Sequence, residues 1–116
     1  MKYEQKLNND YIYFKLFGEF EFTYLKNLFS QIRTECENNG LNKALIDCIE
    51  VKNLYKSDME RFFIGKTIAH TLRRDIKLAA VVGNDKFNLF GEYTANNRGA
   101  NFKLFTYKDN ALEWLF

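Results

Sequence analysis

Three apolar runs, separated by segments of helical length, organise the second half of this chain. The runs lie at residues 44–49, 78–82 and 102–107, and apolar residues recur at helical spacing in the segments between them. Strands that alternate with helices predict parallel βαβ units and an α/β domain. We therefore expect the three strands to be parallel neighbours, or near neighbours, in one sheet.

The first twenty residues predict an antiparallel pair of strands. Residues 2–7 form the first candidate strand, and the Asn-Asn-Asp sequence at 8–10 is a turn signal. Apolar and polar residues alternate over 11–17, and so short a turn favours antiparallel pairing. Gly18 is predicted to end the second strand.

A segment with apolar residues at helical spacing follows each of the last four predicted strands, so four helices are predicted. The first helix is predicted to end near Gly40, which suits the left-handed conformation of a helix cap. The third is predicted over about residues 86–97, with Phe87 and Phe90 facing inward, and Asp109 is predicted to cap a short last helix. The apolar face of the first helix comprises Phe22, Leu25, Leu28, Phe29, Ile32 and Cys36.

The second helix, which begins at Ser57, carries apolar residues on most of its sides. Gly65 is small enough to let the helix approach the sheet closely. Phe63, Ile64 and Ile68 exceed what a single contact with the sheet needs. We therefore expect Phe63, Ile64 or Ile68 to lie at a subunit interface or beneath another segment.

Composition narrows the class of protein. The 116 residues are enough for one domain, and 12 Phe and 7 Tyr form an aromatic surplus that favours a ligand groove or a self-association face. The net charge of +2 argues against a dedicated nucleic-acid-binding protein. Arg73, Arg74 and Lys77 cluster, and we interpret them as the solvated end of a helix.

The cysteines and the hydropathy pattern predict a cytoplasmic protein. Cys36 and Cys48 form no Cys-x-x-Cys pair, and charged residues interrupt the first twenty positions, so no secretory signal is indicated. No apolar stretch approaches the roughly 20 residues that span a bilayer. Reduced thiols and no transmembrane segment are therefore expected.

Residues suited to catalysis lack the partners that catalysis needs. His70 is the single histidine, and the sequence implies neither an orienting group nor a nucleophile beside it. Asp47 and Glu50 are interpreted as edge and loop carboxylates. No cluster has metal-ligand spacing. We predict a non-enzymatic protein with no catalytic residue, no metal and no cofactor.

Two positions are candidates for contact with a ligand or for modification. Ser57 and Glu60 have the spacing of a capping box, so Ser57 is predicted to cap the second helix. Phosphorylation or ligand contact at Ser57 and Asp58 are the alternatives, because a helix N-terminus favours an anion, although Asp58 would oppose a phosphate. Arg98 could bind helix C-terminal carbonyls, pair with Glu92 or contact an anion.

The edge beyond the carboxyl ends of the strands is the predicted binding edge. In open α/β sheets ligands favour this crevice, which here would be formed by residues 50–57, 83–85 and 107–108. These segments contain no glycine-rich phosphate cradle and no nucleophile with a base. They indicate a binding surface better than an active site.

An ordered set of short motifs runs through most of the chain. The motifs are Met59-Glu60-Arg61-Phe62, Gly65-Lys66, the strand at 78–82, Phe90-Gly91-Glu92, Asn97-Arg98-Gly99 and Ala111-Leu112-Glu113-Trp114-Leu115. The set resembles the SpoIIAA-like group of small bacterial proteins, which are related to the STAS domains of anti-sigma-factor antagonists and sulfate transporters. This resemblance implies a βα superhelix with a mixed five-stranded sheet and about four helices.

The resemblance also implies a function. Antagonists of this type are switched by phosphorylation of a serine at the start of the second helix, and Ser57 falls at the matching place, although the Asp that precedes that serine is absent here. We predict a binding or regulatory module whose partner is another protein or a second copy of the chain. The alternative, which rests on the aromatic surplus, is a carrier or sensor of a small hydrophobic ligand or lipid. The nearer relatives are compared with lipid-binding CRAL-TRIO domains because of their shared topology. An apolar cavity would favour this alternative, and an exposed apolar patch would favour the first function.

Overall fold

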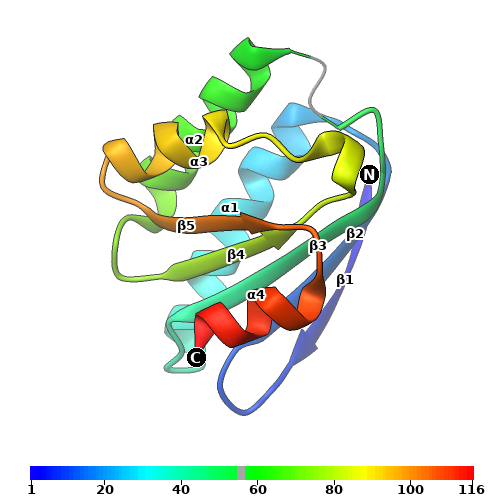
Figure 1. Ribbon diagram of the computed structural model, residues 1–116. Coiled ribbons are helices and arrows are strands. Elements are labelled where there is room, and N and C mark those ends of the chain that lie inside the picture. Colours follow the sequence, from blue (N-terminus) through cyan, green and yellow to red (C-terminus); the bar gives the residue numbers. More distant parts are fainter. Residues whose placement is uncertain (55–56) are drawn as a thin grey trace.

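Five strands form one mixed sheet, and helices cover both of its faces (Figure 1). The computed structural model of the protein describes residues 1–54 and 57–116. The strands are β1 (Lys2–Leu7), β2 (Ile12–Glu19), β3 (Lys43–Lys52), β4 (Lys77–Val81) and β5 (Asn101–Phe105). The helices in the described residues are α1 (Phe22–Asn38), α2 (Asp58–Leu72), the short 3₁₀ helix η1 (Asn84–Lys86), α3 (Phe90–Asn97) and α4 (Lys108–Leu115).

The strands follow one another across the sheet in sequence order. β1 pairs with β2 in the antiparallel direction, whereas β2, β3, β4 and β5 are parallel to one another. The predicted α/β class, with a mixed five-stranded sheet and four helices, is confirmed. The carboxyl ends of β2, β3, β4 and β5 therefore meet at one edge of the sheet, as the sequence predicted for the last three.

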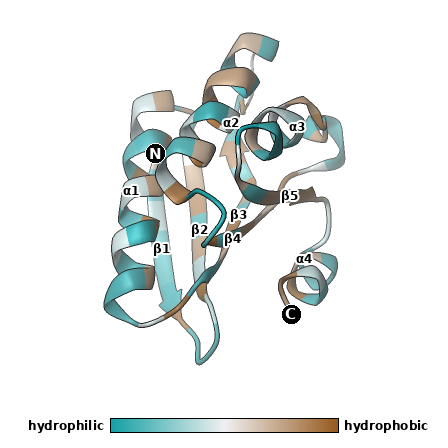
Figure 2. Cartoon of the chain, turned by 90° about the vertical axis from the view of Figure 1, so that its left-hand side faces the viewer, coloured by the Kyte–Doolittle hydropathy of each residue, from teal (hydrophilic) through white to brown (hydrophobic). Residues whose placement is uncertain are grey.

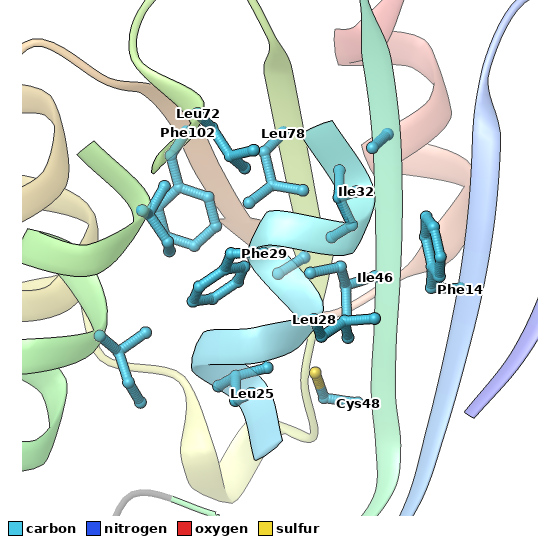
Figure 3. Close-up of a cluster of buried hydrophobic side chains, with 14 of the residues drawn as sticks. Phe14, Leu25, Leu28, Phe29, Ile32, Ile46, Cys48, Leu72, Leu78 and Phe102 are labelled. Carbon is cyan, nitrogen blue, oxygen red and sulfur yellow. The ribbon is translucent and has the colours of Figure 1, made fainter. Parts of the chain in front are cut away.

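The two faces of the sheet build two hydrophobic cores. Because side chains alternate along a strand, Ile46 of β3 enters the larger core beneath α1 and α2, and Leu45 enters the smaller core beneath α4. Figure 3 shows the larger core, where Phe29 of α1, Phe102 of β5 and Leu72 of α2 lie in one cluster. The smaller core contains Leu45, Ala79, Val81, Ala111 and Leu115.

Helix α2 approaches α3 closely through a glycine. A Cβ atom on Gly65 would lie 2.5 Å from the carbonyl oxygen of Gly91 and 2.9 Å from the side chain of Thr94. The absence of a side chain at Gly65 therefore permits the contact with α3, and the expectation that it serves an approach to the sheet was wrong.

Arg33 of α1 fixes the other end of α2. Its guanidinium donates hydrogen bonds to the carbonyl oxygens of Thr71 (2.6 Å) and Leu72 (2.7 Å), where the helix leaves carbonyls without intrahelical partners. It also pairs with Asp75 at 2.7 Å, which raises the pKa of Arg33 and lowers the pKa of Asp75. One side chain thus joins α1 to the turn between α2 and β4.

Several element boundaries differ from those predicted. Gly18 does not end β2, because it pairs in register with Val51 and the strand continues for one more residue. Helix α3 begins only at Phe90. Just before it, the side chain of Asn88 accepts a hydrogen bond from the Phe90 amide in a local turn. As a result Phe87 and Phe90 are exposed and do not face inward.

The last helix also begins before its predicted cap. Asp109 lies within the first turn of α4, and Tyr107 occupies the N-cap position without a side-chain capping bond.

Candidate binding surfaces

The N-terminus of α2 lies at the edge formed by the carboxyl ends of the parallel strands. The predicted cap is present: the Ser57 hydroxyl accepts a hydrogen bond from the Glu60 amide at 3.2 Å. The Asp58 carboxylate accepts from Arg61 Nη1 at 3.2 Å. Ser57 and Asp58 are both exposed, so each remains accessible to a kinase or a ligand. The preceding residues of this turn, Tyr55 and Lys56, lie outside the described part of the chain.

Exposed apolar side chains cover the first turns of α2. Met59 is 68% exposed and Phe63 is 44% exposed. The ring of Phe63 lies 5.5 Å from that of Phe62 and 6.4 Å from that of Phe22, which opens α1. Figure 2 shows hydrophobic segments on these turns, where α2 rises past the end of the sheet. We call Phe22, Met59, Phe62 and Phe63 the α2 aromatic surface.

Two of the three candidate interface residues lie inside the protein. Ile64 is 3% exposed and Ile68 is 2% exposed, and both belong to the larger core. Burial beneath other segments of the same chain removes them from the candidate interface. Phe63 alone of the three faces solvent.

A small apolar cavity lies in the larger core beneath α2. Its volume is about 20 Å³, and its walls come from α1, α2 and the strands β3, β4 and β5. A cavity that binds benzene measures about 150 Å³, so this one has no room for a lipid chain in the closed arrangement. The lining residues are Leu25, Phe29, Ile46, Cys48, Ile64, Ile68, Leu78, Ala80 and Phe102.

Both thiols are buried and poorly reactive. Burial raises the pKa of Cys48 to about 12 and that of Cys36 to about 11. Thiolates are the reactive species, so neither cysteine is suited to nucleophilic chemistry at neutral pH.

The carboxylates of β3 take part in structural contacts. Asp47 accepts a hydrogen bond from the Tyr13 hydroxyl at 2.7 Å, and burial together with this contact raises the pKa of Tyr13. Glu50 pairs with Lys15 at 2.8 Å. Across the described residues, no group of three His, Cys, Asp or Glu side chains could hold a metal ion.

Arg98 makes one of the two helix contacts predicted for it: at the C-cap of α3 its backbone amide donates a hydrogen bond to the carbonyl oxygen of Ala95 at 3.1 Å, whereas no ion pair joins it to Glu92 in the described residues. The Glu92 carboxylate accepts a hydrogen bond from the Leu104 amide at 2.7 Å. The Arg98 guanidinium lies 5.1 Å from the centre of the Phe62 ring. Arg98 lines a groove together with Lys66, His70 and Arg73. Sequence reasoning missed this groove because it joins residues from two helices. Its one signal was the recurrence of basic residues at 66, 70 and 73 on one side of a helix.

Comparison with known proteins identifies the architecture. The sequence matches no family model and no curated protein. The structure is similar to that of an uncharacterized protein of the DUF3478 family from Shewanella loihica PV-4, described as having a SpoIIAA-like fold. The TM-score is 0.52 at 22% identity, over 99% of this chain and 93% of the other. The chain has a SpoIIAA-like fold.

This identification confirms the fold expected from the motifs, and at that identity the likeness concerns the fold alone. Function has to be argued from the surfaces of this chain. No helix in the described part of the SpoIIAA-like domain is long and apolar enough to cross a membrane.

Proposed function

We propose that this protein is a non-enzymatic, cytoplasmic binding module that docks another protein on the α2 aromatic surface. The observation that carries the proposal is the exposure of Met59 and Phe63 on the first turns of α2, at the edge where α/β sheets place their binding sites. Full burial of a Met or Phe side chain contributes about 1.5–3 kcal/mol, so covering both contributes substantially to an interface.

The surroundings of these two side chains suit a docking site. Phe22 and Phe62 support the ring of Phe63 from behind, which limits the conformational entropy that binding would cost. Aromatic anchors of this kind dominate the binding energy of many protein interfaces. The two buried, free cysteines suit a reducing compartment, which supports a cytoplasmic location.

The position of Ser57 and Asp58 beside this surface supports a regulatory role for them. Ser57 precedes Met59 by two positions and is exposed, so a phosphate there would add charge beside the aromatic surface. We propose this as a regulatory option of the same site. The hydroxyl already caps α2, so a cap-only role accounts for the residue if no modification occurs.

Photo-crosslinking in cells tests the docking proposal. A photoreactive phenylalanine analogue at position 63 is expected to capture one specific protein, whereas the analogue at Lys26, an exposed residue of α1, is expected to capture none. A cross-link to a second copy of the chain would identify the partner as self. Equal labelling from both positions, or none from position 63, would contradict the proposal.

A second candidate function is the binding of a small apolar ligand in the cavity beneath α2. The apolar lining favours it, but the volume of about 20 Å³ requires α2 to move away before a ligand enters. Cys48 lies in the cavity wall and reports such opening. In a Cys36→Ala background, ligand entry predicts that a fatty acid protects Cys48 from a thiol reagent. If the thiol reagent labels Cys48 slowly and the fatty acid leaves that rate unchanged, this function is excluded.

A further inference from the structure

We infer that the groove between the C-terminal parts of α2 and α3 binds a phosphate group. The groove is open, has a volume of about 400 Å³ and lies at the amino ends of β4 and β5. It shares no lining residue with the α2 aromatic surface, but the two meet where the Arg98 guanidinium lies over the ring of Phe62. The variant Arg73→Gly therefore tests the groove separately from the docking proposal. Its lining residues are Lys66, Ala69, His70, Arg73 and Arg98.

The cations of this groove form no salt bridge with an acid in the described residues. Ion pairs elsewhere in residues 1–54 and 57–116 join acids to the N-terminus, Lys15, Arg33 and Arg61. Lys66, Arg73 and Arg98 appear in none of them. Arg33, and to a smaller extent Arg73, lower the pKa of Asp75, so the charge of Asp75 acts on Arg73 without a salt bridge. Three cations that line one groove and form no salt bridge still create a local positive potential, which attracts a multivalent anion.

The nearest acids along the flanking segments are engaged elsewhere. Asp75 follows the groove in sequence, but it pairs with Arg33. Glu92 of α3 accepts the backbone amide of Leu104. Neither carboxylate lines the groove, so neither occupies the place of an external anion.

Neutralisation of helix C-termini accounts for only part of the cluster. Cations near the last turn of a helix interact favourably with its dipole, and Arg73, at the C-cap of α2, satisfies that description. Lys66 lies in the middle of α2. Arg98 is held over the ring of Phe62, so its guanidinium reaches back along α2, away from the end of its own helix. A cation–π contact of this kind orients the guanidinium before any ligand arrives.

The backbone at Arg73 supports the same conclusion. Its φ of 56° and ψ of −152° lie close to a region that glycine populates almost exclusively. An arginine there strains the backbone, and such strain clusters at ligand sites. A favourable contact of its guanidinium with a bound anion would offset the strain.

Phosphate is the anion class that fits these groups best. The guanidinium fork of arginine matches phosphate oxygens in bidentate geometry, and lysine adds a point charge. The groove volume falls within the range of small-molecule sites, about 300–1,000 Å³. The phosphate could belong to a soluble metabolite or to a lipid headgroup, and the experiment below separates the two.

Titration with inorganic pyrophosphate, followed by two-dimensional amide NMR at fixed ionic strength, tests the site. We expect amide shifts centred on residues 66, 70, 73 and 98. Loss of one arginine should weaken binding roughly tenfold, the effect of about 1.4 kcal/mol, in Arg73→Gly and in Arg98→Gln. Lys26→Gln, which removes an exposed cation of α1, should leave binding unchanged. Arg73→Gly is expected to fold, because glycine suits that backbone.

A parallel arm uses vesicles of phosphatidylcholine with and without phosphatidic acid. Pyrophosphate binding that depends on Arg73 and Arg98 supports the site with a soluble ligand. Binding to phosphatidic acid vesicles alone, with the same dependence, supports the site with a lipid headgroup. The inference is overturned if neither probe binds, if the arginine variants bind normally, or if chloride at matched ionic strength causes the same shifts.

Discussion

The two ends of α2 present opposite chemistry to solvent. At the N-terminal end, Met59 and Phe63 are exposed beside the carboxyl ends of the strands. At the C-terminal end, His70 and Arg73 line a groove beside the amino ends of β4 and β5, together with Lys66 from the middle of the helix. Both ends extend from one buried middle, which packs against α1, α3 and the core. A single helix with a fixed middle can therefore carry two binding surfaces of different chemistry.

Both ends of α2 depend on the contact between Gly65 and α3, which holds the middle of the helix in place. The substitution Gly65→Ala should break this contact. The added Cβ would meet the Gly91 carbonyl at 2.5 Å, so α2 and α3 must separate. We expect overpacking to lower the free energy of unfolding by about 2–3 kcal/mol, measured by urea denaturation. Because both surfaces are built on α2, both should lose binding.

Gly91→Ala is the matched control for this substitution. A Cβ at Gly91 would lie 3.4 Å from the nearest atom, the Arg61 carbonyl oxygen, which is ordinary contact. Stability should stay the same or rise by about 0.4–1 kcal/mol, since alanine restricts the unfolded chain. Equal stability of the two alanine variants would show that α2 does not rest on α3 at Gly65.

At the N-terminal end of α2, the next prediction concerns the stability that the Ser57 cap contributes. Ser57→Ala removes the hydrogen bond to the Glu60 amide and should lower the free energy of unfolding by about 0.5–2 kcal/mol. Ser57→Asp should keep most of that stability, because aspartate also caps and suits the helix dipole. Thermal unfolding of the three proteins measures the effect.

The cap-only role and the phosphorylation switch predict different partner binding. Phosphopeptide mass spectrometry that finds Ser57 modified, together with partner binding changed by that phosphate, would overturn the cap-only role. Unmodified Ser57 under growth, starvation and stress, with normal partner binding by Ser57→Ala, would exclude the switch.

The smallest predicted effect concerns acid stability at the C-terminal end. The Arg33 guanidinium lowers the pKa of Asp75, so the folded state favours the ionised carboxylate. The stabilisation is fully present above the unfolded pKa of about 3.9 and is lost as the pH falls through the lower folded value. Because the Asp75 side chain is 64% exposed, solvent screening keeps the effect small.

Unfolding measured between pH 7 and pH 2 checks this effect. Asp75→Asn should lose slightly less stability on acidification than the wild type, and Arg33→Gln should remove that difference. A steeper acid loss in Asp75→Asn than in the wild type would contradict the assigned ion pair.

The sequence predicted the elements whose periodicity is strong. The structure contains the expected apolar faces of β2 and α1 and the expected parallel strands β3, β4 and β5. These could be predicted because burial on one or both faces requires apolar residues at regular spacing. The start of α3 was misplaced, because a local turn made by Asn88 shortens the helix in spite of its apolar spacing.

The binding surfaces were less accessible to sequence reasoning. Ser57 could be assigned as a cap from spacing alone, and the apolar excess of α2 is visible in the sequence. Which of those residues face solvent could not be decided, because α3 covers α2 through Gly65 and α1 covers the side of Ile64 and Ile68. The basic groove joins Arg98 to residues of another helix. The spacing of residues within one helix cannot predict a contact between two helices.

Affinity for the protein captured at position 63 tests the central claim most directly. Isothermal titration calorimetry with the purified partner should compare the wild type with Phe63→Ala and with Arg73→Gly, one variant for each end of α2. We predict that Phe63→Ala weakens binding about tenfold or more, as expected for an aromatic anchor, while Arg73→Gly binds like the wild type. Unchanged affinity in a folded Phe63→Ala variant would contradict the account.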